Sequence, residues 1–176
     1  GEYINNPLLT NQLNYKEKIN AFYTQYGSKY KKLSYQFGLR LEDSNIDINF
    51  LTTQDFRNKK YYNFFPSLFL TYEVNEATSY SLNYSRRINR PRNRFINPFA
   101  GYSSNINLFQ GNPDIDPAFT DALNFSILTK INKVTLTSSL YYNYTKNPFQ
   151  FIRRKNGDTV TTFINGLTTI TDVLLS

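Results

Sequence analysis

Hydrophobic and polar residues alternate along much of this chain with a period of two. The clearest stretch is 33–42, where the odd positions are apolar or aromatic and the even positions are Ser, Gln, Gly, Arg and Glu. This alternation predicts β-strands with one apolar and one polar face. No stretch shows the period of about 3.6 that marks a helix, so we predict an all-β chain. The predicted strands cover residues 15–26, 33–42, 67–74, 80–85, 123–127 and 134–145, of which the first is the weakest.

The connections between these strands alternate in length. They are predicted at residues 28–32, 43–60, 75–78, 89–117 and 132–133. Short turns at one end and long loops at the other are typical of outer-membrane barrels, whose strands of about 10 to 14 residues cross the membrane at a tilt. The expected fold is therefore an antiparallel meander of about seven strands from a large transmembrane β-barrel.

A hairpin signal follows the last of these strands. Residues 155–158 read Lys-Asn-Gly-Asp, which fits a type I′ turn. Because this turn lies well past the end of a membrane-length strand, residues 149–164 are expected to project into water as a β-ribbon.

The alternation also assigns the two faces of the predicted sheet. One face should contact lipid and the other the barrel interior, because a slip of one residue would turn every side chain over. The expected lipid face carries Leu33, Tyr35, Phe37, Leu39, Leu41, Leu68, Leu70, Leu82, Phe125, Ile127, Leu136 and Leu140. The expected interior face carries Ser34, Gln36, Arg40, Ser81, Asn83 and Arg87.

Composition removes several kinds of site. The 176 residues include 15 Tyr and 15 Phe but no Cys, His, Met or Trp. Without Cys and His the chain has no disulfide, no zinc cluster and no Ser-His-Asp triad. No carboxylate pair is placed for acid–base work, so we expect no enzyme activity, no catalytic residue, no metal site and no cofactor. The lack of Met indicates a processed product or an excerpt of a longer protein.

A soluble antiparallel β-sandwich would show the same alternation, and it is the main alternative. Such a protein would bind glycan or protein through its aromatic faces. The order of side chains favours the membrane, because Tyr62 and Phe64 precede Leu68 and Leu70, and Tyr72 follows. Aromatic residues that flank a short apolar band are typical of the two membrane interfaces.

Positive charge is unevenly distributed in a chain of net charge +7. Five arginines lie between residues 86 and 94, and a second basic cluster covers 153–155. A basic stripe among aromatic residues can bind nucleic acid, which is a third alternative. We expect no nucleic-acid partner, since the charges lie at strand ends and in loops and no nucleic-acid motif occurs.

Three motifs in order resemble a known family: residues 85–91 (SRRINRP), 96–99 (INPF) and 110–117 (QGNPDIDP). Further matches are residues 38–42 (GLRLE), 63–68 (NFFPSL) and 142–148 (YNYTKNP). Together they resemble the barrel domain of the TonB-dependent receptor-like outer-membrane β-barrel proteins of Bacteroidetes. The best-matching part is 14–154, and the chain leaves the pattern after Gly166. Residues 1–176 are thus expected to be a section of a single barrel domain, with no plug domain present.

The resemblance implies a barrel of about 22 strands with a plugged lumen in the outer membrane of a Gram-negative bacterium. It implies TonB-dependent uptake of a bulky nutrient of the glycan, siderophore or peptide class. The implied partners are outer-membrane lipid, the rest of the same barrel and its plug, the TonB system and a surface lipoprotein. With about seven strands, the section alone is expected to transport nothing.

A ligand is expected at the long loop 89–117 and the interior residues beneath it, because long loops on a rigid scaffold carry binding residues. Arginine side chains suit carboxylate, phosphate or sugar oxygens, and aromatic rings stack on flat faces. A framework role is equally open, in which Pro and Gly fold the loop onto the barrel rim. The candidate residues are Arg87, Arg90, Arg92, Arg94, Phe95, Asn97, Phe99, Tyr102 and Phe109.

Overall fold

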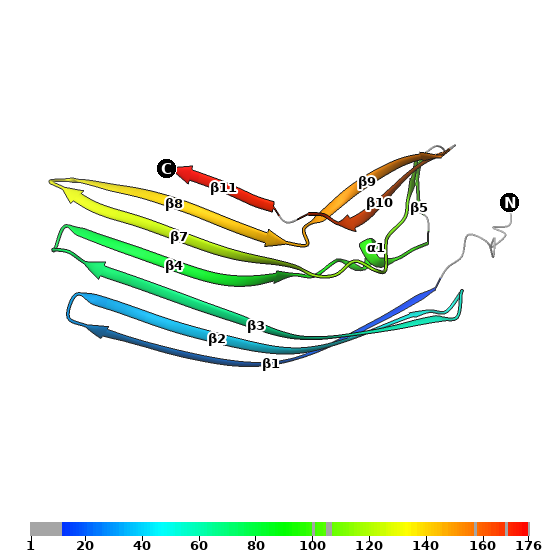
Figure 1. Ribbon diagram of the computed structural model, residues 1–176, viewed down its shortest axis with the longest axis horizontal. Helices are drawn as coiled ribbons and strands as arrows, with labels where there is room; N and C mark the ends of the chain where they lie inside the picture. The colour runs from blue at the N-terminus through cyan, green and yellow to red at the C-terminus, as the bar shows by residue number, and fades with distance from the viewer. Residues whose placement is uncertain (1–11, 100, 105–106, 157, 168, 176) are drawn as a thin grey trace, which may run out of the picture.

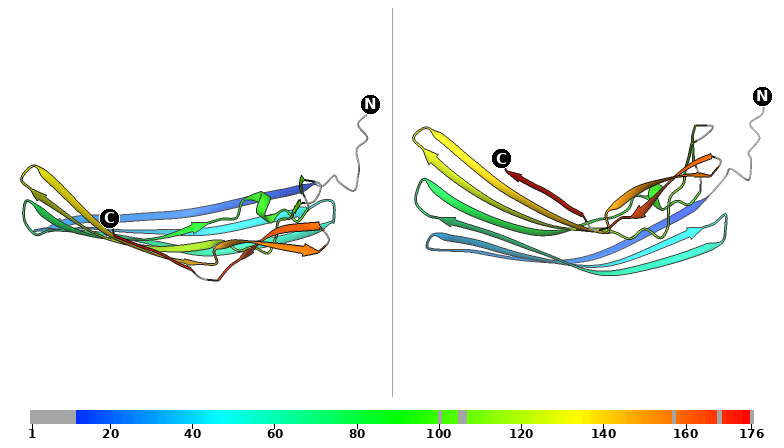
Figure 2. Two further views of the ribbon diagram at one scale, coloured as in Figure 1. Left: turned by 90° about the horizontal axis from the view of Figure 1, so that it is seen from above. Right: turned by 45° about the horizontal axis from the view of Figure 1, so that its top comes forward.

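The computed structural model describes residues 12–99, 101–104, 107–156, 158–167 and 169–175. Most of them lie in a curved sheet of seven strands in the order β1-β2-β3-β4-β7-β8-β11 (Figures 1 and 2). Every neighbouring pair is antiparallel, which confirms the predicted all-β meander. The strands of this sheet are β1 (Leu13–Tyr30), β2 (Leu33–Phe50), β3 (Asp55–Glu73), β4 (Thr78–Asn89), β7 (Ala118–Ile131), β8 (Val134–Lys146) and β11 (Thr169–Leu175).

The prediction of a long loop at residues 43–60 is wrong. Residues 43–50 continue β2, residues 55–60 begin β3, and only a turn at 51–54 separates them. The apolar positions change from odd to even between Leu41 and Ile46, so alternation followed in one phase ends too early. The strands are consequently longer than expected, with 18 residues in β2 and 19 in β3.

In other respects the prediction for the two ends of the sheet is confirmed, with short turns at one end and a long connection at the other. Short turns join β1 to β2, β3 to β4 and β7 to β8 at one end, and residues 90–117 lie at the other (Figure 1). Lys31 and Asn132 adopt the left-handed conformation in two of these turns, at φ 54° and 56°. The chain between β4 and β7 forms the short helix α1 (Asn93–Ile96) and the strands β5 (Gly101–Ser104) and β6 (Asn107–Phe109).

The sheet divides near its loop end. Strand β3 pairs with β2 along its whole length but with β4 only over Ser67–Glu73. Pro66 lies where this second pairing stops, which suits a residue that has no N–H to donate to a ladder. From Pro66 toward the loop end of the sheet, β1, β2 and β3 continue as a three-stranded part that is called the extension. In this region β4 pairs only with β7.

The predicted β-ribbon exists as β9 (Phe149–Asn156) and β10 (Asp158–Asn165), which are paired with each other. Gly157 of its turn lies outside the described residues. Strand β10 also pairs in parallel with β6, so the ribbon joins a second sheet of order β5-β6-β10-β9. After Gly166, β11 returns to the main sheet beside β8.

The register confirms that the residues predicted for each face lie together. One row across five strands is Tyr35, Leu70, Leu82, Phe125 and Leu140, and its side is called the outer face. The next row is Ser34, Thr71, Ser81, Ser126 and Ser139, and its side is called the inner face.

The seven-stranded sheet is called the wall, and its two faces are covered to very different degrees. On the outer face Phe22, Phe64 and Tyr62 are 64%, 64% and 76% exposed, unlike the buried face of a sandwich. The buried cluster instead lies on the inner face of the extension, where Ile46, Ile48, Phe50 and Ile96 meet. The one helix in the described part of the chain is too short to cross a membrane.

Candidate ligand-binding site

The loop between β4 and β7 packs against the inner face of the extension. Ile96, at the end of α1, is 4% exposed and contacts Ile46, Ile48 and Phe50. The ring of Phe99 meets the ring of Phe50 edge-on, with centroids 6.2 Å apart. Apolar burial therefore holds this loop over the side of the sheet that the alternation assigns to the barrel interior.

The two loop motifs bind each other through their backbones. The Gly111 N–H donates to the carbonyl of Asn97 at 2.8 Å, and the Asn112 N–H donates to that of Phe95 at 2.6 Å. A Cβ at Gly111 would lie 2.7 Å from the Phe95 oxygen and 2.8 Å from the Asn97 nitrogen, so only glycine allows this approach. The Asn97 side chain accepts the N–H of Phe99 at 3.1 Å. These contacts favour the framework role for Asn97.

Arg90 joins the loop to the sheet through buried charge. Its Nη2 donates to Glu42 Oε2 at 2.5 Å and to Ser44 Oγ at 3.2 Å, and its Nε lies 3.2 Å from Glu17 Oε1. The Glu42 side chain is fully buried and also pairs with Arg40. A buried carboxylate is tolerated only when it is paired in this way. The guanidinium of Arg90 is therefore engaged within the protein.

Tyrosines border this network. The Tyr15 hydroxyl donates to Glu17 Oε2 at 3.2 Å. Burial, and then the charge of Glu17, raise the pKa of Tyr15 to about 12. Tyr61 donates to Asp116 Oδ1 at 3.2 Å, and burial together with that carboxylate raises its pKa as well. Both hydroxyls thus remain donors at neutral pH.

Carboxylates at the end of the loop contact basic residues of β3. Lys59 Nζ donates to the carbonyl of Ile115 at 3.1 Å and lies 3.4 Å from Asp116 Oδ1. Asp114 forms an ion pair with Arg57. The side chain of Asn165, in β10, donates to the carbonyl of Asp116 at 2.9 Å and connects the ribbon to the same place.

Arg94 lies beside two aromatic rings of the loop. The guanidinium carbon of Arg94 lies 5.2 Å from the ring centroid of Phe95 and 5.7 Å from that of Phe109. Phe95 also meets Phe149 of β9 edge-on at 6.4 Å. Arg92 and Arg94 are both exposed. Exposed arginines beside aromatic rings can accept an anionic or sugar-like group.

Arg87 lies apart from these residues, lower on the inner face. It is exposed and stands opposite Thr120 in the register. Thr120 and Thr145 are hydrogen-bonded through their hydroxyls at 2.9 Å. The open groove at this place offers hydroxyl, amide and guanidinium groups from Arg87, Asn89, Thr120, Asn143 and Thr145.

The predicted candidates thus fall into two groups. Arg90, Asn97 and Phe99 hold the loop in place, whereas Arg87, Arg92 and Arg94 face solvent. The backbone of Tyr102 pairs with Leu108 in the small sheet, and its side chain lies outside the part that the structure describes. The anchoring role of Glu17, Glu42 and Ser44 was not predicted from the sequence, and neither were the polar groups of Thr120, Asn143 and Thr145. The signal available in the sequence was that the apolar residues change from odd to even positions after Glu42.

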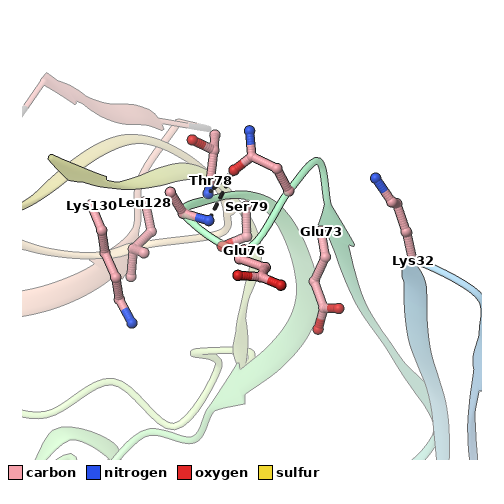
Figure 3. Close-up of a pocket in the computed structure, with 9 residues that line it drawn as sticks. Lys32, Glu73, Glu76, Thr78, Ser79, Leu128 and Lys130 are labelled. Carbon is pink, nitrogen blue, oxygen red and sulfur yellow. Dashed lines mark hydrogen bonds between the residues drawn. The ribbon is translucent and has the colours of Figure 1, made fainter.

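A second hollow lies at the opposite end, among the short turns (Figure 3). Glu73 pairs with Lys29 at 2.8 Å, and Lys32 Nζ donates to the carbonyl of Val74 at 2.5 Å. The Asn75 side chain accepts the N–H of Thr78 at 2.8 Å and closes the turn. These contacts stabilise the turns around the hollow, so the turn structure alone explains why the hollow is there. Within the described residues no group of three metal-ligating side chains occurs at either end.

Comparisons with known proteins agree with this architecture. The model of an outer membrane protein beta-barrel family matches residues 1–169. The crystal structure of the siderophore receptor PirA from Pseudomonas aeruginosa is similar, with a TM-score of 0.55 and 11% sequence identity. This match covers 89% of the present chain and 38% of the receptor chain, and at such an identity it concerns the fold alone. No curated protein matches the sequence.

Proposed function

Because the chain belongs to the outer membrane protein beta-barrel family, we propose that it forms part of the wall of a receptor-type transporter for a bulky nutrient. The protein lies in the outer membrane. Its short turns are then periplasmic and its long loop is extracellular, as in other outer-membrane barrels. The role that we propose is not enzymatic, and a chain without His or Cys suits it.

The observation that carries the proposal is the loop packed against the inner face of the wall. A loop in this position narrows the extracellular end of a barrel and presents its exposed groups to a molecule entering from outside. Arg92 and Arg94 lie in the loop at the extracellular end. The groove at Arg87 lies below them on the inner face. A ligand held first by the loop and then by the groove would follow the interior wall.

The nutrient class is proposed as glycan, siderophore or peptide. Arginine and hydroxyl groups suit the carboxylate or hydroxyl oxygens that these classes share. We further propose that the parent protein resembles the TonB-dependent receptors of Bacteroidetes, with a plug in its barrel, energy from TonB and a surface lipoprotein as partner. The similarity in fold to the siderophore receptor supports the receptor-barrel part of this proposal.

Two variants of the parent protein test the proposal. Replacing Arg92 and Arg94 with Ala should reduce nutrient uptake by about thirtyfold, since two lost charged contacts of about 1 kcal/mol each amount to about 2 kcal/mol. Surface expression should remain normal, because both side chains are exposed. Gly111→Val should lower the amount of assembled barrel itself, since the Asn97 backbone leaves no room for a side chain.

Uptake and surface expression are measured together, with Lys130→Ala at the periplasmic turns as the matched control. Unchanged uptake in the arginine double variant, with normal expression, would assign the loop to the scaffold alone. Normal assembly of Gly111→Val would contradict the framework argument for the two motifs.

A further inference from the structure

Above the aromatic side chains, the outer face of the extension becomes basic. The register places Phe22, Leu41 and Phe64 side by side in one row of three strands. Four residues farther along each strand toward the extracellular end, a parallel row holds Lys18, Asn45 and Lys60. Both rows lie on the face that contacts lipid lower down. The change from aromatic to basic side chains therefore occurs where the membrane meets water.

The aromatic row borders a hollow in the outer surface. Phe22, Leu41, Phe64 and Tyr62 line it, together with Asn20 and Asp43, which lie in the row between the aromatic and the basic rows. Phe22 and Phe64 are each 64% exposed, so their rings are available to a lipid chain. The described residues provide no other part of the protein that covers this hollow.

Lys18 and Lys60 are exposed, and neither forms an ion pair with another described residue. The two rows are separated by about 13 Å along a strand, and lysine side chains are long enough to reach back toward the interface. Two carboxylates share this surface. Asp43 lies in the row between, and Asp47 accepts a hydrogen bond from Asn58 at 2.6 Å.

We propose that this surface binds a phosphorylated lipid of the outer leaflet. The phosphate lies between Lys18 and Lys60, with the Asn45 amide between them, and an acyl chain lies in the hollow along Phe22 and Phe64. Charge complementarity favours a phosphate over a neutral headgroup, since basic side chains at a membrane surface attract anionic lipids. Asp43 opposes the anion and sets a limit on its affinity. The proposal rests on the outer-membrane location and not on the transport function.

The experiment uses the parent barrel in detergent with diphosphoryl lipid A and its dephosphorylated form as probes. Binding is measured by native mass spectrometry as the fraction of barrel that carries lipid at each lipid concentration. K18Q/K60Q should bind the diphosphoryl form about tenfold more weakly and the dephosphorylated form almost unchanged. K18R/K60R should retain binding, and K130Q/K133Q at the periplasmic turns should match the unmodified barrel.

D43N supplies a test of opposite sign, because removing the carboxylate should tighten binding of the diphosphoryl form by about twofold to fivefold. Equal affinity of K18Q/K60Q and the unmodified barrel for that lipid would overturn the proposal. An equal loss for the dephosphorylated form would also overturn it, since the lysines would then not be recognising phosphate. The shift in gel mobility between heated and unheated barrel confirms folding of every variant.

Discussion

Strand β2 passes through two surroundings, and its two halves have opposite patterns. In residues 33–41 the apolar side chains are at odd positions on the outer face, where Leu39 is 36% exposed. In residues 43–50 they are at even positions on the inner face, where Ile48 is 1% exposed. The backbone continues without interruption through the change, because both halves pair in one register with β1 and β3.

The difference shows what each face is built to contact. In the lower half we expect the outer face to meet hydrocarbon and the inner face to meet the polar barrel interior. In the upper half we expect the outer face to meet water, and the inner face is covered by α1 and the loop around it. We therefore expect that the place where the apolar residues change from odd to even positions marks the height at which the strand leaves the membrane.

The largest effect is expected from truncating the upper apolar face. Ile48→Ala should cost about 4 kcal/mol in docking of the loop, because the closed core leaves a cavity. Hydrogen exchange in the parent barrel measures this as lost protection of the amides in α1. Leu39→Ala in the lower half is the matched control, and lipid can fill the space that it opens. Equal loss of α1 protection in both variants would contradict the assignment of the two halves.

A charge on the lower outer face should have the next largest effect. Leu70→Arg should destabilise the folded barrel by about 3 kcal/mol if the site lies near the bilayer midplane. Ser81→Arg, in the adjacent row of the inner face, should be nearly neutral. Urea titration of the barrel folded into vesicles measures both. A similar cost at the two positions would refute the assignment of lipid and interior faces.

A smaller effect is expected where the two halves of β2 meet. Glu42→Gln should weaken loop docking by about 1–2 kcal/mol, because Arg90 loses a charged partner but keeps Glu17. Faster tryptic cleavage after Arg92 and Arg94 would report the loosened loop. Glu73→Gln is the control, since its ion pair with Lys29 is half exposed and contributes little. Unchanged cleavage in Glu42→Gln would show that apolar packing alone holds the loop.

Much of the fold could be predicted from local pattern. The strands in the lower part of the wall, the short turns and the assignment of faces all follow from alternation, since a sheet repeats every two residues whatever its partners are. The β-ribbon followed from four residues of turn sequence. The length of β2 and β3 could not be predicted in this way. Their upper halves alternate around a core that includes Ile96, which comes from a distant part of the chain.

The candidate site divides along the same line. Residue type alone identified the arginines and aromatic rings of the loop as suited to a ligand. Only the tertiary structure separated Arg90, which is held by Glu42 and Glu17, from Arg92 and Arg94, which are exposed. All three have the same chemistry, and what distinguishes them is whether a carboxylate from another strand lies within reach.

The sequence by itself determined the class of fold, the two faces of the wall and the motifs of the long loop. These depend on spacing within a strand or a turn, which involves neighbouring residues only. The tertiary structure decided where the strands end, which side of the sheet the loop covers and which charges are neutralised. Those outcomes depend on contacts between residues far apart in the chain, such as Gly111 with Asn97 and Arg90 with Glu42. Their energy comes from burial and pairing that exist only after the sheet has formed.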